Sequence, residues 1–378
     1  MLSMLASFAS VMTTIGYVIV AILVLMLMIT IHELGHYTFG KKLGFKINEF
    51  AIGFGKAIYK KTMKSGEIFS IRIIPLGGYC AFAGEDEDDA DPGAFNNQKP
   101  WKRLIVQFGG VFFNFLSAIL FAFILLIGFG YDVPKVNQVD TNFQTTIQAN
   151  DVIREIDNIK VDFITDNTAN SIISNHYKNM TQEQLDNYRT VVIEDKTYKC
   201  YDNLLSFTIQ REGEAEWIDV QANLYTYAET IDGKVATQLY IGFGTVPYQH
   251  TFGEALARCV PLACAFAWKV LVFLWMLLTG GIGIAEIGGP FTTISTIAEY
   301  SQQNIANLFV FLPFISANLA IFNILPIPSL DGARMVFTTI EWIRGKPINR
   351  KVEGYIHTVG LFILFALVIF VDLYHLFI

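Results

Sequence analysis

The sequence has little charge for its size. Only 16% of its 378 residues are charged, whereas 53% are hydrophobic, and the mean hydropathy is +0.42. Because so few charges cannot cover the surface of a large soluble enzyme, we expect the bilayer to form part of the solvent. The formal net charge of −7 gives no electrostatic reason to expect a nucleic acid as a partner.

Paired cysteines and a basic N-terminal segment are also missing. The four cysteines form no Cys-x-x-Cys pair, so a zinc site built from cysteines is not expected. No Lys or Arg precedes Lys41, and the first apolar run is longer than the core of a signal peptide. We therefore expect this run to be a retained transmembrane helix.

Four apolar segments have the length that a helix needs to cross a bilayer. They are Ile15–Tyr37, Leu104–Tyr131, Ile305–Leu325 and Ile356–Tyr374. A fifth stretch, Cys259–Leu278, is ambiguous. Basic residues gather between the first two spans and between the last two, so four crossings place both basic loops in the cytosol, whereas a fifth would force one outside. We predict that Cys259–Leu278 is a helix that lies at the outer interface or packs on the helix bundle.

The only large polar block runs from about residue 132 to 250. Residues 151–161 alternate apolar and polar side chains around Asp157-Asn158, a pattern typical of a hairpin. Residues 205–210 and 217–222 also read as strands, and residues 174–188 have helical character. We predict a small β-rich extracytoplasmic domain.

A second strand-like region precedes the second span. Two apolar stretches, residues 68–74 and 78–83, flank Pro75-Leu-Gly-Gly and predict a hairpin that packs into the membrane domain rather than facing water. The fold class is then an α-helical polytopic membrane protein with a membrane-associated β-hairpin and an extracytoplasmic β-rich domain. The expected divisions are 1–131 for the first half of the membrane core, 132–250 for the β-rich domain, 251–303 for an interfacial helix and linker, and 304–378 for the second half of the core.

The first span ends in His32-Glu-Leu-Gly-His36. Residues four apart lie on the same face of a helix, so both imidazoles can bind one zinc ion. Glu33 can then reach a zinc-bound water, take its proton and return it to the leaving amine. Two histidines and a glutamate near the inner edge of the hydrocarbon core are costly without a metal. The alternative is a helix end whose polar residues merely reach the cytosolic interface.

A catalytic zinc of this type needs a third protein ligand and leaves one position for water. Asp331 follows the third span at a similar depth, after Pro326 and Pro328 end the helix. We predict that Asp331 is the third ligand. It could also cap a helix that starts at this point, and one carboxylate can serve both purposes.

Together, the two motifs carry a family resemblance. His32-Glu-Leu-Gly-His36 and Asn323-x-x-Pro-x-Pro-x-Leu-Asp331-Gly resemble the site-2 protease family of intramembrane zinc metalloproteases, and most closely its bacterial branch that cleaves anti-sigma factors. The resemblance covers nearly the whole chain. It implies Zn²⁺ as the cofactor, His32, His36 and Asp331 as its ligands, and Glu33 as the catalytic acid and base.

The resemblance also implies partners and a location. Residues 150–161 are similar to a segment of PDZ domains, with Asn150 where that segment has a glycine, and there is room for one such domain. The implied substrates are single-span membrane proteins, such as anti-sigma factors or remnant signal peptides, that a site-1-type protease has already trimmed. The implied location is the bacterial plasma membrane, with the PDZ-like domain and both termini outside and the active site near the cytosolic side.

Asparagines inside the apolar spans are candidates for contact with the substrate. These are Asn114, Asn318 and Asn323. The last two could hold an unwound substrate backbone or polarise the scissile carbonyl, and hydrogen bonds between helices are the alternative for all three. His357, near the cytosolic start of the last span, is a candidate for supporting the metal ligands.

Two functions without proteolysis compete with this reading. One is a membrane scaffold that uses the PDZ-like domain as a binding module. The other is a zinc transporter with the same ligands, although Glu33 would then have no task.

Overall fold

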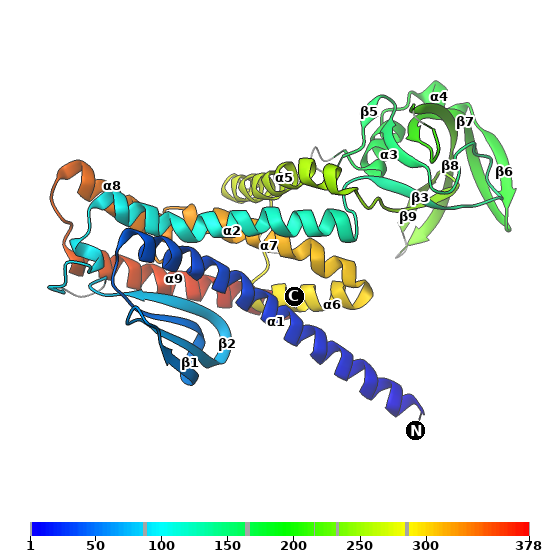
Figure 1. Ribbon diagram of the computed structural model, residues 1–378. Coiled ribbons are helices and arrows are strands. Elements are labelled where there is room, and N and C mark those ends of the chain that lie inside the picture. The colour runs from blue at the N-terminus through cyan, green and yellow to red at the C-terminus, as the bar shows by residue number, and fades with distance from the viewer. Residues whose placement is uncertain are drawn as a thin grey trace. The chain divides into compact units, whose positions relative to one another are not determined.

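The computed structural model describes residues 2–85, 89–162, 167–214, 216–231, 234–283 and 287–377. The chain forms two compact units. Unit 1 comprises Met1–Ala122 and Leu262–Ile378, and unit 2 comprises Phe123–Pro261. Figure 1 shows that most of unit 1 is helical, whereas unit 2 is built mainly of strands.

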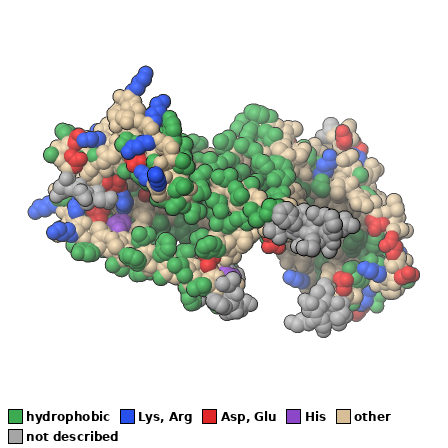
Figure 2. All heavy atoms as spheres, turned by 90° about the horizontal axis from the view of Figure 1, so that it is seen from below, with side chains coloured by type: hydrophobic (Ala, Val, Ile, Leu, Met, Phe, Trp, Pro, Cys, Tyr) green, Lys and Arg blue, Asp and Glu red, His purple; other side chains and the backbone are tan. Residues whose placement is uncertain are grey.

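In the part of the chain that the structure describes, five helices are long and apolar enough to cross a membrane. Four overlap the predicted spans, although two of these helices end at Gly128 and Ile324, before the predicted ends at Tyr131 and Leu325. The fifth contains Cys259–Leu278, which we expect at the outer interface. Its length and apolar character would also permit a crossing, so its depth in the membrane stays a prediction. Figure 2 shows hydrophobic side chains gathered over the helices of unit 1. The five are α1 (Leu2–Leu43), α2 (Pro100–Gly128), α5 (Phe252–Leu278), α7 (Ile305–Ile324) and α9 (Arg350–Phe377).

Two shorter helices complete unit 1. α6 (Pro290–Gln303) packs against α1 and α7, and Asp372 of α9 accepts hydrogen bonds from the backbone N–H and hydroxyl of Thr292 in its first turn. α8 (Asp331–Arg344) is tied to α2 by a buried ion pair in which Arg103 Nη1 lies 2.6 Å from Glu341 Oε2. α2 therefore holds α8 near its C-terminal end.

A hairpin is present in this region, but the prediction of its two strands is wrong. Residues 68–74 and 78–83 do not pair with each other, because they belong to one strand, β2 (Ile68–Phe82), whose partner is β1 (Ile47–Thr62). The register between β1 and β2 shifts at several places, including the region around Pro75-Leu-Gly-Gly where the turn was expected. Phe50 of β1 pairs with both Cys80 and Phe69 of β2. The first half of β1 thus lies between the two halves of β2, which leaves the second half of β2 at an edge. A short 3-10 helix, η1 (Phe95–Asn97), follows the hairpin.

The tip of this hairpin is tied to α1 through Glu67. The buried Glu67 carboxylate accepts hydrogen bonds from Lys41 Nζ at 2.6 Å, Tyr37 Oη at 2.9 Å and Ser65 Oγ at 3.0 Å. Burial alone would raise the pKa of Glu67, but the bond from Lys41 and the other donors outweigh it and lower the pKa to about 2. The charged form of Glu67 therefore holds the hairpin to the helix.

Stability should depend on pH through this group. Because the pKa is lowered in the folded protein, the contribution of Glu67 is complete above the ordinary value near 4.5 and is lost as the pH falls toward 2. We expect Glu67→Gln to lower the melting temperature of the detergent-solubilised protein at pH 7. The difference from the parent should shrink at pH 3. An equal difference at both values would contradict the assignment.

Unit 2 is built on one antiparallel sheet. Its strands lie in the order β10-β3-β4-β7-β8-β9, with β5 paired to β4 and β6 paired to β7. Helices α3 and α4 complete the unit, and a core cluster that includes Ile153, Phe207 and Leu224 fills it. The strands are β3 (Pro134–Val139), β4 (Val152–Ile156), β5 (Ile159–Lys160), β6 (Arg189–Ile193), β7 (Lys196–Gln210), β8 (Ile218–Ile231), β9 (Lys234–Tyr240) and β10 (Phe243–Pro247), and the helices are α3 (Ala169–Lys178) and α4 (Gln182–Asp186).

The local predictions for this unit are confirmed. β4 and β5 pair through Ile156 and Ile159, and both turn residues, Asp157 and Asn158, have positive φ, as a two-residue hairpin of type I′ requires. Asn150 has φ 76°, a conformation that asparagine enters more readily than most residues. This explains how asparagine can stand where the resembling segment has glycine.

A buried charge network closes unit 2 at its chain entry and exit. Asp132 accepts hydrogen bonds from His250 Nε2 at 2.6 Å and Arg258 Nε at 2.6 Å, and Arg258 also binds Asp162. Burial acts to raise the pKa of Asp132, but the bond from His250 and the charge of Arg258 hold it below the ordinary value. Arg258, a charge in the first turns of α5, is therefore compensated within unit 2.

Candidate metal centre

The two histidines of the first span lie on one face of α1. His32 and His36 are both buried, and their Nε2 atoms are 3.2 Å apart. This is the outcome expected for residues separated by one helical turn. Both rings therefore present a nitrogen to the same point.

Asp331, which is distant from the two histidines in the sequence, lies at the same point. α7 ends at Ile324, the segment with Pro326 and Pro328 follows, and α8 begins at Asp331. Asp331 Oδ2 lies 2.9 Å from His32 Nε2 and 3.2 Å from His36 Nε2. The structure thus brings together the three residues that the sequence predicts as ligands, and in the described residues they form a group able to hold a metal ion.

The donor set fits zinc. Ligands about 2.05 Å from a tetrahedral zinc are separated from one another by roughly 3.3 Å, close to the three spacings found here. Asp331 Oδ2 is buried and has no hydrogen-bond donor within the described part of the chain. Two imidazoles and one carboxylate also match the ligand set of catalytic zinc sites that leave a fourth position open.

The outer nitrogens of both rings are engaged by α2. His36 Nδ1 lies 2.8 Å from the carbonyl oxygen of Val106, so Nδ1 carries the proton and Nε2 keeps its lone pair. Asn114 has no exposed surface, and its amide nitrogen Nδ2 lies 3.2 Å from His32 Nδ1. Turning its amide by 180° places Oδ1 opposite the Nδ1 proton and gives this buried oxygen the partner that it otherwise lacks among the described residues.

Asn114 is therefore placed to orient His32. A fully buried side chain bonded to a ligand favours this role over the predicted contact with substrate. We expect Asn114→Leu to weaken zinc binding about 10- to 100-fold, as loss of such an orienting partner commonly does. Chelator competition on the purified protein would measure the change. Asn114→Asp, which keeps an acceptor oxygen, should bind zinc more tightly than Asn114→Leu, and equal affinities would contradict the role.

Close approach of α1 and α2 depends on glycines that sequence reasoning did not single out for this purpose. A Cβ added at Gly110 would overlap His32 Cε1 and His36 Nε2, and one at Gly35 would overlap the carbonyl oxygen of Gly109. Small residues that face each other in two apolar helices were the available signal. The glycines let the backbone of α2 lie directly against the imidazoles.

Glu33 faces the hairpin. Its Oε2 accepts a hydrogen bond of 3.0 Å from the backbone N–H of Cys80 in β2. This bond holds the carboxylate against the half of β2 that lies at the sheet edge. Glu33 itself lies on the same helical turn of α1 as His32 and His36. The catalytic candidate therefore lies beside a strand edge that has no further strand partner among the described residues.

Asn318 and Asn323 lie on α7 and are half-buried. No hydrogen bond joins either amide to the three ligand residues in the described part of the chain. Asn318 Oδ1 is buried there without a partner, so it has an open acceptor position. Their proposed contact with substrate remains a prediction.

The arrangement can support hydrolysis. Zinc held by these three side chains would lower the pKa of a water in its fourth position and polarise a carbonyl oxygen. The Glu33 carboxylate can accept a proton and return it to a leaving amine. The buried histidines and their partners on α2 keep the ligand atoms in place.

Comparisons with known proteins agree with this chemistry. The model of peptidase family M50 matches residues 20–367. A protein of Nostoc sp. named "putative zinc metalloprotease" is 28% identical over 93% of this chain and 94% of its own length. Proteins with the same name from Synechocystis sp. and Clostridium acetobutylicum are 29% and 26% identical over 93% and 94% of this chain, and over 92% and 96% of their own lengths.

The match to the family model covers most of the chain and includes both motifs of the metal centre. With five apolar helices of spanning length, the protein is a multi-pass membrane protein. The chain belongs to peptidase family M50, the site-2 protease family, and is a zinc metalloprotease.

Proposed function

We propose that this protease hydrolyses peptide bonds within transmembrane segments of single-span membrane proteins. One observation carries the proposal: the metal centre is formed by two residues of α1 and by Asp331, which follows the loop after α7, and both helices are long and apolar enough to cross a bilayer. An active site supported by such helices meets substrates that share the bilayer. A soluble protein would have little access to it.

The cut is made near the cytosolic side of a bacterial plasma membrane, with unit 2 and both termini outside. The distribution of Lys and Arg supports this topology, because they gather in the segments after the first span and before the last. Four crossings satisfy this bias, with α5 at the outer interface.

An extended substrate strand adds to the free edge of β2. A transmembrane helix satisfies its own backbone hydrogen bonds, so cleavage requires it to open, and an unpaired strand edge can replace the lost partners. The edge half of β2 carries Cys80, whose N–H already bonds the catalytic Glu33. A substrate strand on this edge would lie beside the metal centre.

Asn318 and Asn323 hold the opened substrate backbone or polarise its scissile carbonyl. The open acceptor at Asn318 Oδ1 supports this role, because a substrate N–H can donate to it. Both side chains lie on α7, the helix that leads into the loop before Asp331.

Anti-sigma factors and remnant signal peptides are the proposed substrate classes, each trimmed first by a site-1-type protease. Unit 2 acts as a PDZ-like filter that excludes substrates with bulky outer domains. The hairpin of β4 and β5, the positive φ of Asn150 and the sheet with two helices support a PDZ-like character.

Two matched reporters test the proposal. Both carry the same single transmembrane segment, and one has a short outer tail whereas the other has a folded outer domain. Purified enzyme in lipid vesicles should cut the short-tailed reporter within its apolar segment. Zinc removal by a chelator should stop cleavage, and added zinc should restore it.

Other outcomes would count against each part. Cleavage of an unfolded soluble protein together with an intact membrane reporter would overturn the substrate class. Equal cleavage of both reporters would overturn the requirement for a first cut. A scissile bond mapped to the outer half of the segment would overturn the proposed topology.

A further inference from the structure

The loop that delivers Asp331 contains a residue in an unfavourable conformation. Ser329, two positions before this zinc ligand, has φ 81°. L-residues other than glycine and asparagine rarely adopt such angles, and they persist only where their surroundings hold them. The neighbouring Pro328 cannot contribute a backbone N–H to that task.

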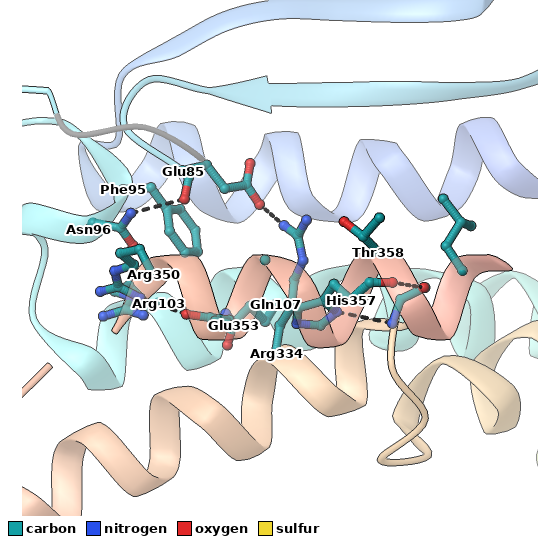
Figure 3. Close-up of a pocket in the computed structure, with 13 residues that line it drawn as sticks. Glu85, Phe95, Asn96, Arg103, Gln107, Arg334, Arg350, Glu353, His357 and Thr358 are labelled. Carbon is teal, nitrogen blue, oxygen red and sulfur yellow. Dashed lines mark hydrogen bonds and ion pairs between the residues drawn. The ribbon is translucent and has the colours of Figure 1, made fainter. Parts of the chain in front are cut away.

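His357 of α9 holds Ser329 with two hydrogen bonds. The backbone N–H of Ser329 donates to His357 Nδ1 at 3.0 Å, and its hydroxyl donates to the carbonyl oxygen of His357 at 2.8 Å. Figure 3 shows His357 on α9, with these bonds drawn as dashed lines. The imidazole also packs edge-on against Phe337 of α8, 5.6 Å between ring centres. One side chain thus contacts both the loop and the helix that Asp331 begins.

Gly360 lies one turn further along the same face of α9 and contacts the loop before Asp331 directly. A Cβ added there would overlap Pro328. Gly354, on the same helix, has open space at the equivalent position, with nothing within 4 Å. The loop therefore lies directly on the backbone of α9 at Gly360.

The other end of the loop is equally confined. A Cβ added at Gly332 would overlap the carbonyl oxygens of Ile324 and Leu325, so the start of α8 rests on the end of α7. Asp331 lies between this contact and Ser329. Its carboxylate position is therefore fixed from both sides by close backbone contacts.

The loop is not enclosed by packing on all sides. A cavity of about 480 Å³ opens beside the loop and is lined by Ser329, His357, Arg334 and Arg350 among others (Figure 3). The contacts at His357 and Gly360 therefore hold a loop that borders this cavity.

We propose that His357 and Gly360 form a seat on α9 that positions the zinc ligand Asp331. They are positioning residues, because they act through Ser329 and Pro328 and touch neither metal nor substrate. The inference deepens the proposed function and rests on its zinc site alone. Disturbing the seat should weaken zinc binding while leaving substrate binding unchanged.

Zinc affinity of the purified full-length protein in detergent tests this seat. His357→Leu removes the acceptor for the Ser329 N–H, and Gly360→Ala pushes Pro328 away. Each should weaken zinc binding about 10- to 100-fold in competition with a chelator, the range found when partners of metal ligands are lost. Activity should fall through kcat with KM unchanged, and excess zinc should restore it.

Two variants serve as matched controls. Asn places its amide oxygen where histidine has Nδ1, so His357→Asn should retain zinc affinity within about 3-fold. Gly354→Ala adds the same methyl group to the same helix in open space and should bind zinc like the parent. Should His357→Leu or Gly360→Ala fail to fold, Ser329→Ala removes only the hydroxyl bond. It should weaken zinc binding about 2- to 10-fold, which is the usual net value of one hydrogen bond.

Unchanged zinc affinity in folded His357→Leu and Gly360→Ala would overturn the seat, as would weakening of equal size in Gly354→Ala. So would activity losses that excess zinc does not restore, because these would indicate a general structural defect. Failure of the parent to cut the membrane reporter would overturn only the proposed substrate, since zinc affinity is measured without substrate.

Discussion

Replacing Glu33 by Gln should abolish measurable proteolysis and leave one zinc ion bound. The amide keeps the size of the side chain and can still interact with the β2 edge, but it cannot accept the proton of the attacking water. Loss of a general acid and base costs about 10²- to 10⁴-fold in rate. Cleavage of a membrane reporter, together with zinc measured by atomic absorption, would check both halves of this expectation.

Asp331→Asn provides the contrast. It removes a negatively charged ligand that lies 2.9 Å and 3.2 Å from the two histidine nitrogens, so zinc and activity should be lost together. The two variants therefore separate chemistry from metal binding. Equal cleavage by Glu33→Gln and the parent would refute the role of Glu33, and full zinc content in Asp331→Asn would refute the ligand set.

Gly110→Ala should disrupt the metal centre without touching any ligand. The added methyl group would overlap both imidazoles, and α2 cannot withdraw easily because Val106 and Asn114 bond the same rings. Overpacking of this kind costs about 1–3 kcal/mol. If the strain falls on the zinc-bound geometry, zinc affinity should drop about 10- to 100-fold, and chelator competition would measure it.

Gly128→Ala is the matched control on the same helix. The structure has no atom within 4 Å of a Cβ added there, so zinc affinity and activity should match the parent. Loss of zinc in both variants would mean that α2 tolerates no alanine at either position, and the steric account of Gly110 would fail. Normal zinc binding by Gly110→Ala would also contradict it.

Much of the fold could be predicted because the membrane restricts the choices. Long apolar runs identify α1, α2, α7 and α9, and alternation around Asp157-Asn158 identifies the hairpin of β4 and β5. β1 was missed because glycines and lysines interrupt its apolar pattern. β2 was split at Pro75-Leu-Gly-Gly because these residues usually form a turn, whereas here they occupy a shift of register within one strand.

The grouping of the three candidate ligands could be predicted from the sequence, but the residues that support them could not. His32 and His36 share a helical face by geometry alone, and the prolines before Asp331 indicate a chain that turns back. The roles of Asn114, Gly110 and Gly360 depend on which helices become neighbours, which no local pattern encodes. His357 was a candidate only for its position near the end of a span, and its link to Ser329 required the structure.

The candidate ligands of the metal centre are far apart in the sequence. His32 and His36 leave the ribosome well before Asp331 and α9, the helix that contacts its loop. Because chains are synthesised from the N-terminus, a nascent copy holds two ligands and no complete site. A chain that has not yet been extended to Asp331 therefore lacks the third ligand, and with it the site for the catalytic metal.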